Sequence, residues 1–395
     1  MTRRHDIDAL RAIAFALLIL YHLCMLYVTD WDWHIKSSYQ AEWLQWPMLF
    51  LNRWRMDLIF LISGMASAFL LKPDAVMRFV RQRHLRLFLP LVFGILVVVP
   101  VQPYVQGVSN GVVETGFMAF LGDYYSGKTW PENAFSGWEH GFTWNHLWYL
   151  AYLWVYTLAL AVIAKPLDSG LGLRIRARLT GLRGAALMIL PALPLFAFTL
   201  GLQARFPERG DFFHDWYRNA IYFTVFLYGY VLARDSGFWA EAVRVRKASL
   251  FGALASAAVY LGLVAVLPDD ISPGVQALVW AIRNLYVWMM LLAILGWAHA
   301  LLNRPFKWLP WANEAVYPWY MLHQSLIVLI AYWVVSLKLG PVLEPIVVLA
   351  GTLAGCWAGF AVIRRVAWLR PLFGMKPTPR AFAVTVDPPE GTAYS

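Results

Sequence analysis

Residues 11–22 read RAIAFALLILYH, in which an arginine and a histidine enclose ten mostly apolar residues. In a helix this spacing turns Arg11 and His22 to one face, about 16 Å apart along the axis. Ionisable groups at membrane depth are costly and usually face a bundle interior or a water-filled cavity. The stretch therefore predicts a membrane helix with a functional polar face. The alternative is that Arg11 snorkels and pairs with Asp8, while His22 makes a structural interhelical hydrogen bond.

The rest of the chain repeats this apolar pattern. Of its 395 residues, 60% are hydrophobic and only 14% are charged, well below the share in soluble domains. The first segment resembles a signal peptide in its apolar character. However, it contains the ionisable residues Arg11 and His22, and no small-residue cleavage site follows it. We expect an all-α polytopic membrane protein with about ten transmembrane helices, at residues 9–28, 56–71, 87–106, 146–164, 185–203, 217–233, 249–267, 276–300, 314–336 and 345–363.

Lysine and arginine are unevenly distributed between the two sides of this expected bundle. With the N-terminus inside, 23 of the 33 fall in inner segments and 8 in outer loops, while Arg11 and Arg283 lie within helices. Positively charged loops stay in the cytoplasm, so we expect both termini to be cytoplasmic. Orientation and lipid headgroup contact also explain the net charge of +10 without nucleic acid.

One integral membrane domain, residues 1–375, accounts for nearly the whole chain. Residues 376–395 are rich in proline and are expected to form a disordered cytoplasmic tail. The outer loops 29–55 and 107–145 contain many tryptophan and tyrosine residues. Their rings suit either an interfacial belt with loop packing or a platform for sugar rings, and the sequence leaves both open.

The polar residues of the apolar segments do not predict a metal site. Cys24 and Cys356 define neither a disulfide framework nor a ligand spacing. No cysteine or carboxylate completes a zinc set with the histidines. His22, His323 in the ninth segment and His146 at the start of the fourth better suit acid–base chemistry on a hydroxyl at neutral pH.

Other segments carry further candidate site residues. Arg283 lies within the eighth segment. In the second, Ser63 lies among small residues that permit close helix approach. Arg55 and Asp57 are expected at the outer end of that segment, where they meet either a polar substrate or each other.

Five cations precede the third segment, in the stretch from Lys72 to Arg86. Arg83 and Arg86 are three residues apart and are expected on one helix face. Paired guanidinium groups suit phosphates, either of lipid headgroups or of a nucleotide-bearing donor at the inner surface.

Together these motifs resemble the acyltransferase 3 family of bacterial membrane acyltransferases over roughly residues 5–375. The stretches RMDLIFLISG, HLWYL and GMKP bring the chain closest to the glucan biosynthesis protein C branch. The family usually has F-F-x-x-S-G in the second segment, where Ile59 replaces the first Phe. The matching elements are R-x10-H at Arg11 and His22, IFLISG ending in Ser63 and Gly64, RHLR at Arg83 and Arg86 followed by Pro90, HLWYL from His146, and YMLHQ around His323.

The resemblance implies a CoA thioester donor on the cytoplasmic side, succinyl-CoA or acetyl-CoA, as a co-substrate, with no permanently bound cofactor. Members of the branch are implicated in adding succinyl groups to periplasmic glucans. By this resemblance His22 would be the general base or the acyl carrier, Arg11 would lie near the donor's entry, and the RHLR arginines would bind CoA phosphates.

The expected protein is thus a multi-pass O-acyltransferase of the bacterial inner membrane that acylates hydroxyls of a periplasmic glucan or other glycan. Expected partners are membrane lipids, acyl-CoA, the glycan and a glucan synthase. A transporter or flippase for a glycan or lipid-linked substrate is the alternative, because midplane polar groups and proline-broken segments fit it too. The absence of related half-sequences and the one-sided cationic stretch favour the enzyme. A purely structural subunit would leave the histidines and arginines unexplained.

Overall fold

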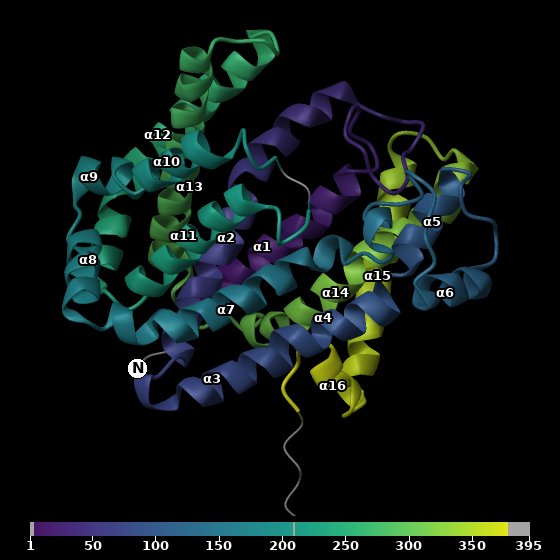
Figure 1. The fold of residues 1–395 in the computed structure, drawn as a ribbon, viewed down its shortest axis with the longest axis horizontal. Helices are drawn as coiled ribbons and strands as arrows, with labels where there is room; N and C mark the ends of the chain where they lie inside the picture. The colour runs from purple at the N-terminus through teal and green to yellow at the C-terminus, as the bar shows by residue number, and fades with distance from the viewer. Residues whose placement is uncertain (1–3, 208–209, 378–395) are drawn as a thin grey trace, which may run out of the picture.

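The computed structural model describes residues 4–207 and 210–377, so the expected tail lies outside the described residues from position 378 onward. Every regular element in these ranges is a helix, and one isolated β-bridge joins Val28 to Ala41 (Figure 1). The α-helices are α1 (His5–Cys24), α2 (Gln45–Leu70), α3 (Val76–Arg83), α4 (Leu89–Phe93), α5 (Val101–Ser109), α6 (Phe117–Ser126), α7 (Trp148–Leu167), α8 (Gly170–Thr180), α9 (Gly184–Ile189), α10 (Ala192–Leu202), α11 (Trp216–Leu232), α12 (Ser236–Val266), α13 (Pro273–Leu302), α14 (Leu309–Val334), α15 (Leu343–Arg365) and α16 (Leu369–Leu372).

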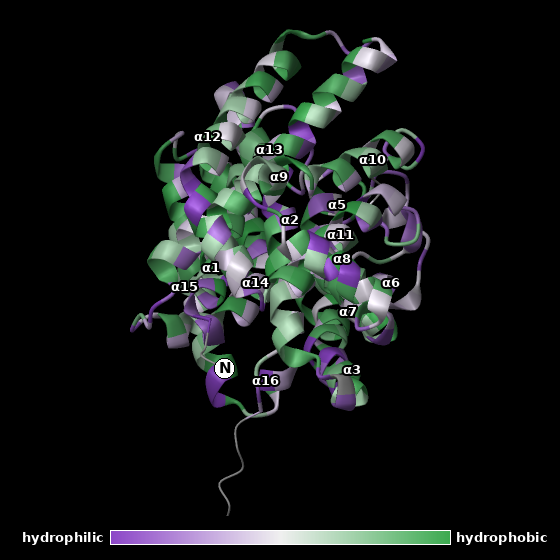
Figure 2. Cartoon of the chain, turned by 90° about the vertical axis from the view of Figure 1, so that its left-hand side faces the viewer, coloured by the Kyte–Doolittle hydropathy of each residue, from purple (hydrophilic) through white to green (hydrophobic). Residues whose placement is uncertain are grey.

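Eight helical spans in the described residues are long and apolar enough to cross a membrane, which confirms the all-α polytopic class. The remaining two expected segments, 56–71 and 217–233, are also helical and correspond to α2 and α11. Apolar residues cover much of the outer faces of the helices, as a surface in contact with lipid requires (Figure 2). The eight spans are His5–Cys24, Val76–Ser109, Asn145–Leu167, Gly184–Leu202, Ser236–Val266, Pro273–Leu302, Leu309–Leu337 and Leu343–Arg365.

Two spans differ from a regular helix for identifiable reasons. The third expected segment, 87–106, belongs to the longer span Val76–Ser109, in which π-helical turns at His84–Phe88 and Gly94–Val98 separate α3, α4 and α5. Of the five cations from Lys72 to Arg86, the four from Arg78 onward are therefore helical, and Lys72 precedes the span. The fifth segment breaks between α9 and α10 at Pro191, because proline lacks an N–H and clashes with the preceding turn.

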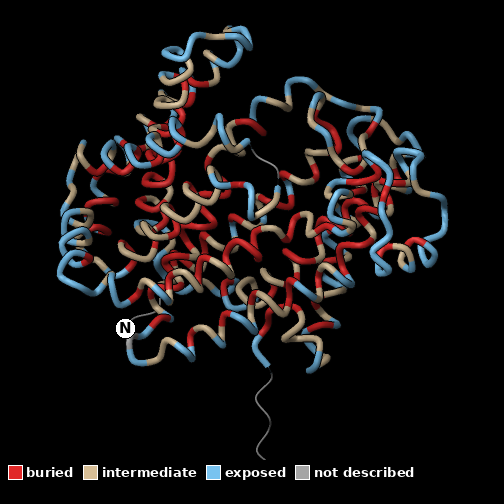
Figure 3. Tube along the Cα trace, in the orientation of Figure 1, coloured by how far each residue is buried: buried red, intermediate tan, exposed pale blue. Residues whose placement is uncertain are grey.

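Helix pairs that are distant in the sequence and pairs that are adjacent in it both form the core. α1 packs on α14, α2 on α11, α12 on α13, and α14 on α15. Buried residues concentrate where these helices meet, while the ends of α12 and α13 project from the body (Figure 3). The buried set includes ionisable side chains from four elements: Arg55, Arg83, Arg283 and His323. Parts of the interior are therefore polar, whereas the surfaces that face lipid are mostly apolar.

Two glycines allow α2 and α11 to touch backbone to backbone. A Cβ atom added to Gly64 would lie 1.9 Å from the carbonyl oxygen of Phe226, and one added to Gly229 would lie 2.0 Å from that of Leu61. Small residues at helix crossings permit this approach in membrane proteins. Gly64 of the IFLISG motif is thus required for packing, and its neighbour Ser63 is held at a fixed position.

Gly64→Ala should destabilise the protein by about 1–3 kcal/mol or more, because the new methyl group meets backbone atoms that cannot rotate away. Thermal unfolding in detergent measures the effect. Gly262→Ala on α12 is the matched control, since nothing lies within 4 Å of the added Cβ. Equal melting temperatures for the two variants would show that α2 and α11 are not in backbone contact.

Candidate functional site

A cavity of about 820 Å³ opens between the first half of α1, the end of α2, the Val76–Ser109 span, α7, α14 and the segment 374–376. This volume suits a cofactor-sized ligand. Six cations and two carboxylates line the cavity, so an anionic ligand is favoured. The cations are Arg4, Arg11, Arg83, Arg86, Arg370 and Lys376, and the carboxylates are Asp8 and Glu314.

Some of these cations have hydrogen-bonding or ion-pair partners among the described residues, and others have none there. Arg11 donates to Asp8 at 3.2 Å and to Asn313 Oδ1 at 2.7 Å, so the alternative of an Arg11–Asp8 pair is realised within the cavity wall. By contrast, no carboxylate in the described part of the chain pairs with Arg83 or Arg86. Arg83 is 9% exposed and its Nε atom has no hydrogen-bond partner among the described residues. These two guanidinium groups are therefore available for an anionic ligand.

The local backbone explains how Arg86 is held. Pro90 has no N–H, so it cannot donate to the carbonyl oxygen of Arg86 one turn earlier. The Tyr317 hydroxyl of α14 donates to that oxygen instead, at 2.7 Å. Together with the π-helical turn at His84–Phe88, a feature often found at functional sites, this contact fixes Arg86 against α14.

Aromatic side chains close the deep end of the cavity. Phe15 contacts Tyr320 at 5.1 Å and Tyr149 at 6.4 Å between ring centres, in edge-to-face geometry. Ser63 Oγ lies 2.5 Å from the Tyr149 hydroxyl. His22 lies about 10 Å beyond Phe15 along α1. The rings thus separate the cationic cavity from the histidine pair.

His22 and His323 form a hydrogen-bonded pair whose tautomers are fixed by their surroundings. His323 Nδ1 lies 2.7 Å from the carbonyl oxygen of Tyr320 and 3.1 Å from that of Trp319. Carbonyl oxygens only accept, so this Nδ1 carries the proton and Nε2 of His323 accepts. His22 Nδ1, 2.8 Å from that Nε2, is therefore the donor.

This arrangement leaves the lone pair of neutral His22 on Nε2. A general base needs that state. His22 is also partly exposed, whereas His323 is fully buried. The pair thus offers one accessible basic nitrogen, oriented by a second imidazole that is itself held by backbone carbonyls.

A buried polar network continues from the pair toward the outer loops. The His146 ring contacts that of His323 at 5.2 Å between ring centres, and His146 Nδ1 accepts from Gln102 at 3.2 Å. Gln324 donates to Gln102 at 3.0 Å and lies 3.1 Å from His34. His146 therefore belongs to the network around the pair, and we expect it to position His323 through the contact between their rings.

His34 lies in the loop after α1 and provides a pH test of this network. Burial lowers the pKa of His34 to about 4, although its hydrogen bond to Gln106 acts in the opposite direction. Unfolded histidine titrates near pH ~6.5, so between these values the unfolded state binds more protons. Stability should therefore fall as the pH is lowered from about 6.5 to about 4.

Thermal unfolding at pH 7.5 and 4.5 measures this loss, and His34→Gln should reduce the difference between the two melting temperatures. His140→Gln, at an exposed histidine of the same side, is the control and should leave it unchanged. If His34→Gln retains the full difference, His34 is not the acid-sensitive group.

The structure corrects the expected position of Arg55 and Asp57. α2 begins at Gln45 and not near residue 56, so both residues lie in the middle of the helix. Their side chains are buried in the protein. The Arg55 guanidinium lies 3.5 Å from the ring centre of Tyr21, the residue before His22, and two of its nitrogens have no hydrogen-bond partner among the described residues. Arg55 therefore belongs to the surroundings of the histidine pair. Asp57 lines a smaller cavity together with Arg283.

Sequence reasoning missed several residues of the site. Tyr149 and Tyr320 lie within the HLWYL and YMLHQ motifs, but tyrosine is also common in membrane belts. Tyr317 could have been found from Pro90, since a proline inside a helix frees a carbonyl that needs a donor. For Asn313 and His34 the sequence shows no periodicity or spacing that indicates a role.

Comparison with known proteins identifies a family over most of the chain and curated relatives over part of it. The profile of the acyltransferase 3 family, described as an acyltransferase domain, matches residues 4–361. Glucans biosynthesis protein C of Escherichia coli is 25% identical over 169 residues, which are 43% of this chain and 41% of that protein. Its counterpart in Shigella dysenteriae is 26% identical over 174 residues, with the same coverage. The chain thus spans about two fifths of these curated relatives. No solved structure gives a significant match.

Proposed function

This chain belongs to the acyltransferase 3 family, and we propose that it is a membrane O-acyltransferase that moves an acyl group from cytoplasmic acyl-CoA to a glycan hydroxyl. Family membership favours an enzyme over the transporter alternative. One observation carries the proposal. A ligand-sized cavity holds two arginines that have no carboxylate partner among the described residues, and it reaches the aromatic residues beside a histidine pair in which His22 Nε2 is the basic nitrogen.

Each part of the site has a role in this reaction. Arg83 and Arg86 bind the phosphates of CoA, and the arginine and lysine residues around them offset the charge of the donor. The pantetheine arm follows the cavity toward Phe15, Tyr149 and Tyr320, whose side chains move to admit the thioester. The water-poor interior strengthens the interactions of charged groups with the donor.

The transfer step can be written with all bonds balanced. His22 Nε2 takes the proton of the acceptor hydroxyl as its oxygen attacks the thioester carbonyl. The C–O bond forms, the C–S bond breaks, and the proton passes from His22 to the CoA thiolate. His323 keeps His22 oriented by accepting from its Nδ1 throughout. If His22 Nε2 attacks the thioester itself, the acyl group passes through an acyl-imidazole to the same products.

The donor and acceptor are proposed from the relatives. The relatives named Glucans biosynthesis protein C support a glucan or other periplasmic glycan as the acceptor and succinyl-CoA or acetyl-CoA as the donor. This assignment places the protein in the inner membrane, with the large cavity and both termini facing the cytoplasm. A glucan synthase supplies the acceptor. The excess of positive charge on that side supports this orientation.

Mass spectrometry of periplasmic glycans tests the proposal. Cells that contain the protein should yield glycans with acyl substituents, which should be absent from cells that lack it and from cells that carry only His22→Ala. Glycans with the same acylation in all three strains would contradict the proposed acceptor.

A further inference from the structure

A second, smaller cavity of about 100 Å³ lies between α2, α10, α11 and α13. Three arginines line it, Arg53, Arg218 and Arg283, against one carboxylate, Asp57, among the described lining residues. Arg218 pairs with the buried carboxylate of Asp215 at 3.8 Å, and Asp57 can neutralise a second arginine. Three arginines against these two carboxylates still leave the cavity wall positively charged. Arginine inside a membrane protein is costly and usually marks a functional site.

Arg283 is the deepest of these cations. It is 8% exposed and donates to Gln203 Oε1 at 2.7 Å and to the Tyr217 hydroxyl at 2.8 Å. Both partners are neutral, so they orient the guanidinium but do not cancel its charge. Arg53 adds a second cation, whose buried Nε has no partner in the part of the chain that the structure describes.

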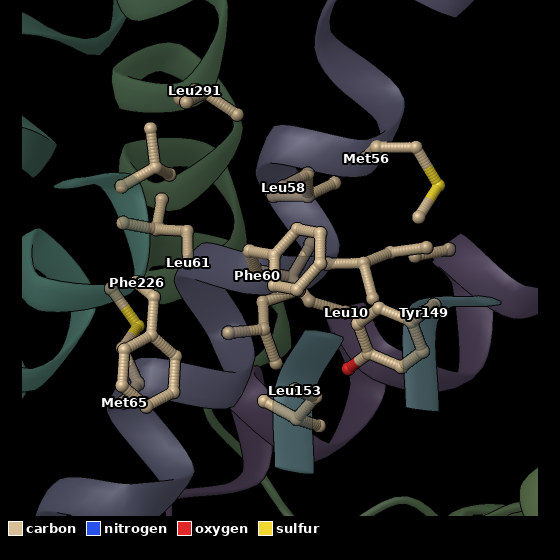
Figure 4. Packing of buried hydrophobic residues seen from close by; sticks show 14 of the residues in the cluster. Leu10, Met56, Leu58, Phe60, Leu61, Met65, Tyr149, Leu153, Phe226 and Leu291 are labelled. Atoms are coloured by element: carbon tan, nitrogen blue, oxygen red, sulfur yellow. The ribbon is translucent and has the colours of Figure 1, made fainter. Parts of the chain in front are cut away.

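The two cavities approach each other along α2. Asp57 lines the smaller one and Ile62 the larger one, about 7.5 Å apart along the helix axis. Between them lies Phe60, which is fully buried. Its ring contacts Tyr149 of the larger cavity at 5.0 Å (Figure 4) and stacks on Tyr222 of the smaller one at 4.8 Å. One layer of aromatic rings thus separates them.

We propose that the smaller cavity is an anion site, which takes one phosphate or carboxylate group from the side of the membrane opposite the large cavity. A bound water needs roughly 10–15 Å³ of such volume, so this cavity accommodates one such group but no nucleotide. The group belongs either to an acidic acceptor glycan or to a lipid headgroup. Assignment to the acceptor rests on the proposed function, whereas the anion site itself does not.

Binding of inorganic phosphate tests the site. The full-length protein is placed in nanodiscs of zwitterionic lipid, with saturating CoA to occupy the larger cavity, and titrated calorimetrically at constant ionic strength. Wild type should bind phosphate saturably, and Arg283→Gln, which keeps an amide donor for its neighbours, should bind at least tenfold more weakly. Arg53→Gln should weaken phosphate binding in the same direction.

Arg83→Lys is the matched control, since it should weaken CoA binding and leave phosphate binding intact. No saturable phosphate binding, or equal phosphate affinity in wild type and both glutamine variants with unchanged CoA affinity, would overturn the anion site. Loss of CoA binding in wild type would count against the proposed function alone. Competition by a sugar phosphate identifies a glycan source, and competition by anionic lipid in the nanodiscs identifies a headgroup.

Discussion

Replacing His22 with alanine should abolish acyl transfer while the protein remains folded and inserted. Proton transfer by a positioned side chain contributes roughly 10²–10⁴-fold to rate, and the variant lacks both the basic nitrogen and the alternative acyl carrier. Initial rates with acyl-CoA and a glycan acceptor measure the loss. CoA affinity should be unchanged, because none of the cations of the large cavity is altered, and this serves as the folding control.

The partner residue gives a second, graded result. His323→Gln keeps a side chain that can accept from His22 Nδ1, so its rate should lie between those of wild type and His22→Ala. Full activity of His22→Ala at normal expression would contradict the assignment and make His323 or His146 the candidate base.

Arg83→Lys and Arg86→Lys should each weaken acyl-CoA binding by about ten- to a hundredfold. Lysine keeps the charge but loses the planar fork that binds phosphate bidentately, and a hydrogen bond to a charged group contributes about 1.5–3 kcal/mol. Calorimetry in one detergent measures the affinities. If the arginines only contact lipid headgroups, both variants should bind acyl-CoA as wild type does.

Arg78→Lys is the matched control for this series. Arg78 lies on α3 with Arg83, but it is exposed and is not among the residues that line the cavity. Its substitution should leave acyl-CoA affinity unchanged. An equal effect of all three substitutions would indicate a general response of the cationic stretch and would remove Arg83 and Arg86 from the donor site.

The sequence predicted the parts of the fold that depend on length and apolar composition. All ten expected segments are helical, and Gly64 packs closely, as its motif indicated. The start of α2 could not be predicted, because Asn52, Arg53 and Arg55 interrupt the apolar pattern. Tertiary contacts make such residues acceptable inside the helix: Arg53 lies over the ring of Tyr260, and Arg55 over that of Tyr21.

The candidate site was predictable only where its residues belong to one helix. The shared face of Arg11 and His22 follows from helical spacing, but the pairing of His22 with His323 joins residues 301 positions apart. Helical spacing relates only residues of the same helix, so it cannot predict such a contact. The same applies to Arg55, whose charge was expected at a water-exposed end and lies instead beside Tyr21.

The most direct test of the central claim is release of free CoA by the purified protein, supplied with succinyl-CoA or acetyl-CoA and a glycan acceptor. We predict that wild type releases CoA in step with acylation of the glycan, and that His22→Ala binds acyl-CoA but releases none. Wild-type protein that binds acyl-CoA and leaves it intact in the presence of acceptor, or a His22→Ala variant that turns it over at the wild-type rate, would contradict the account.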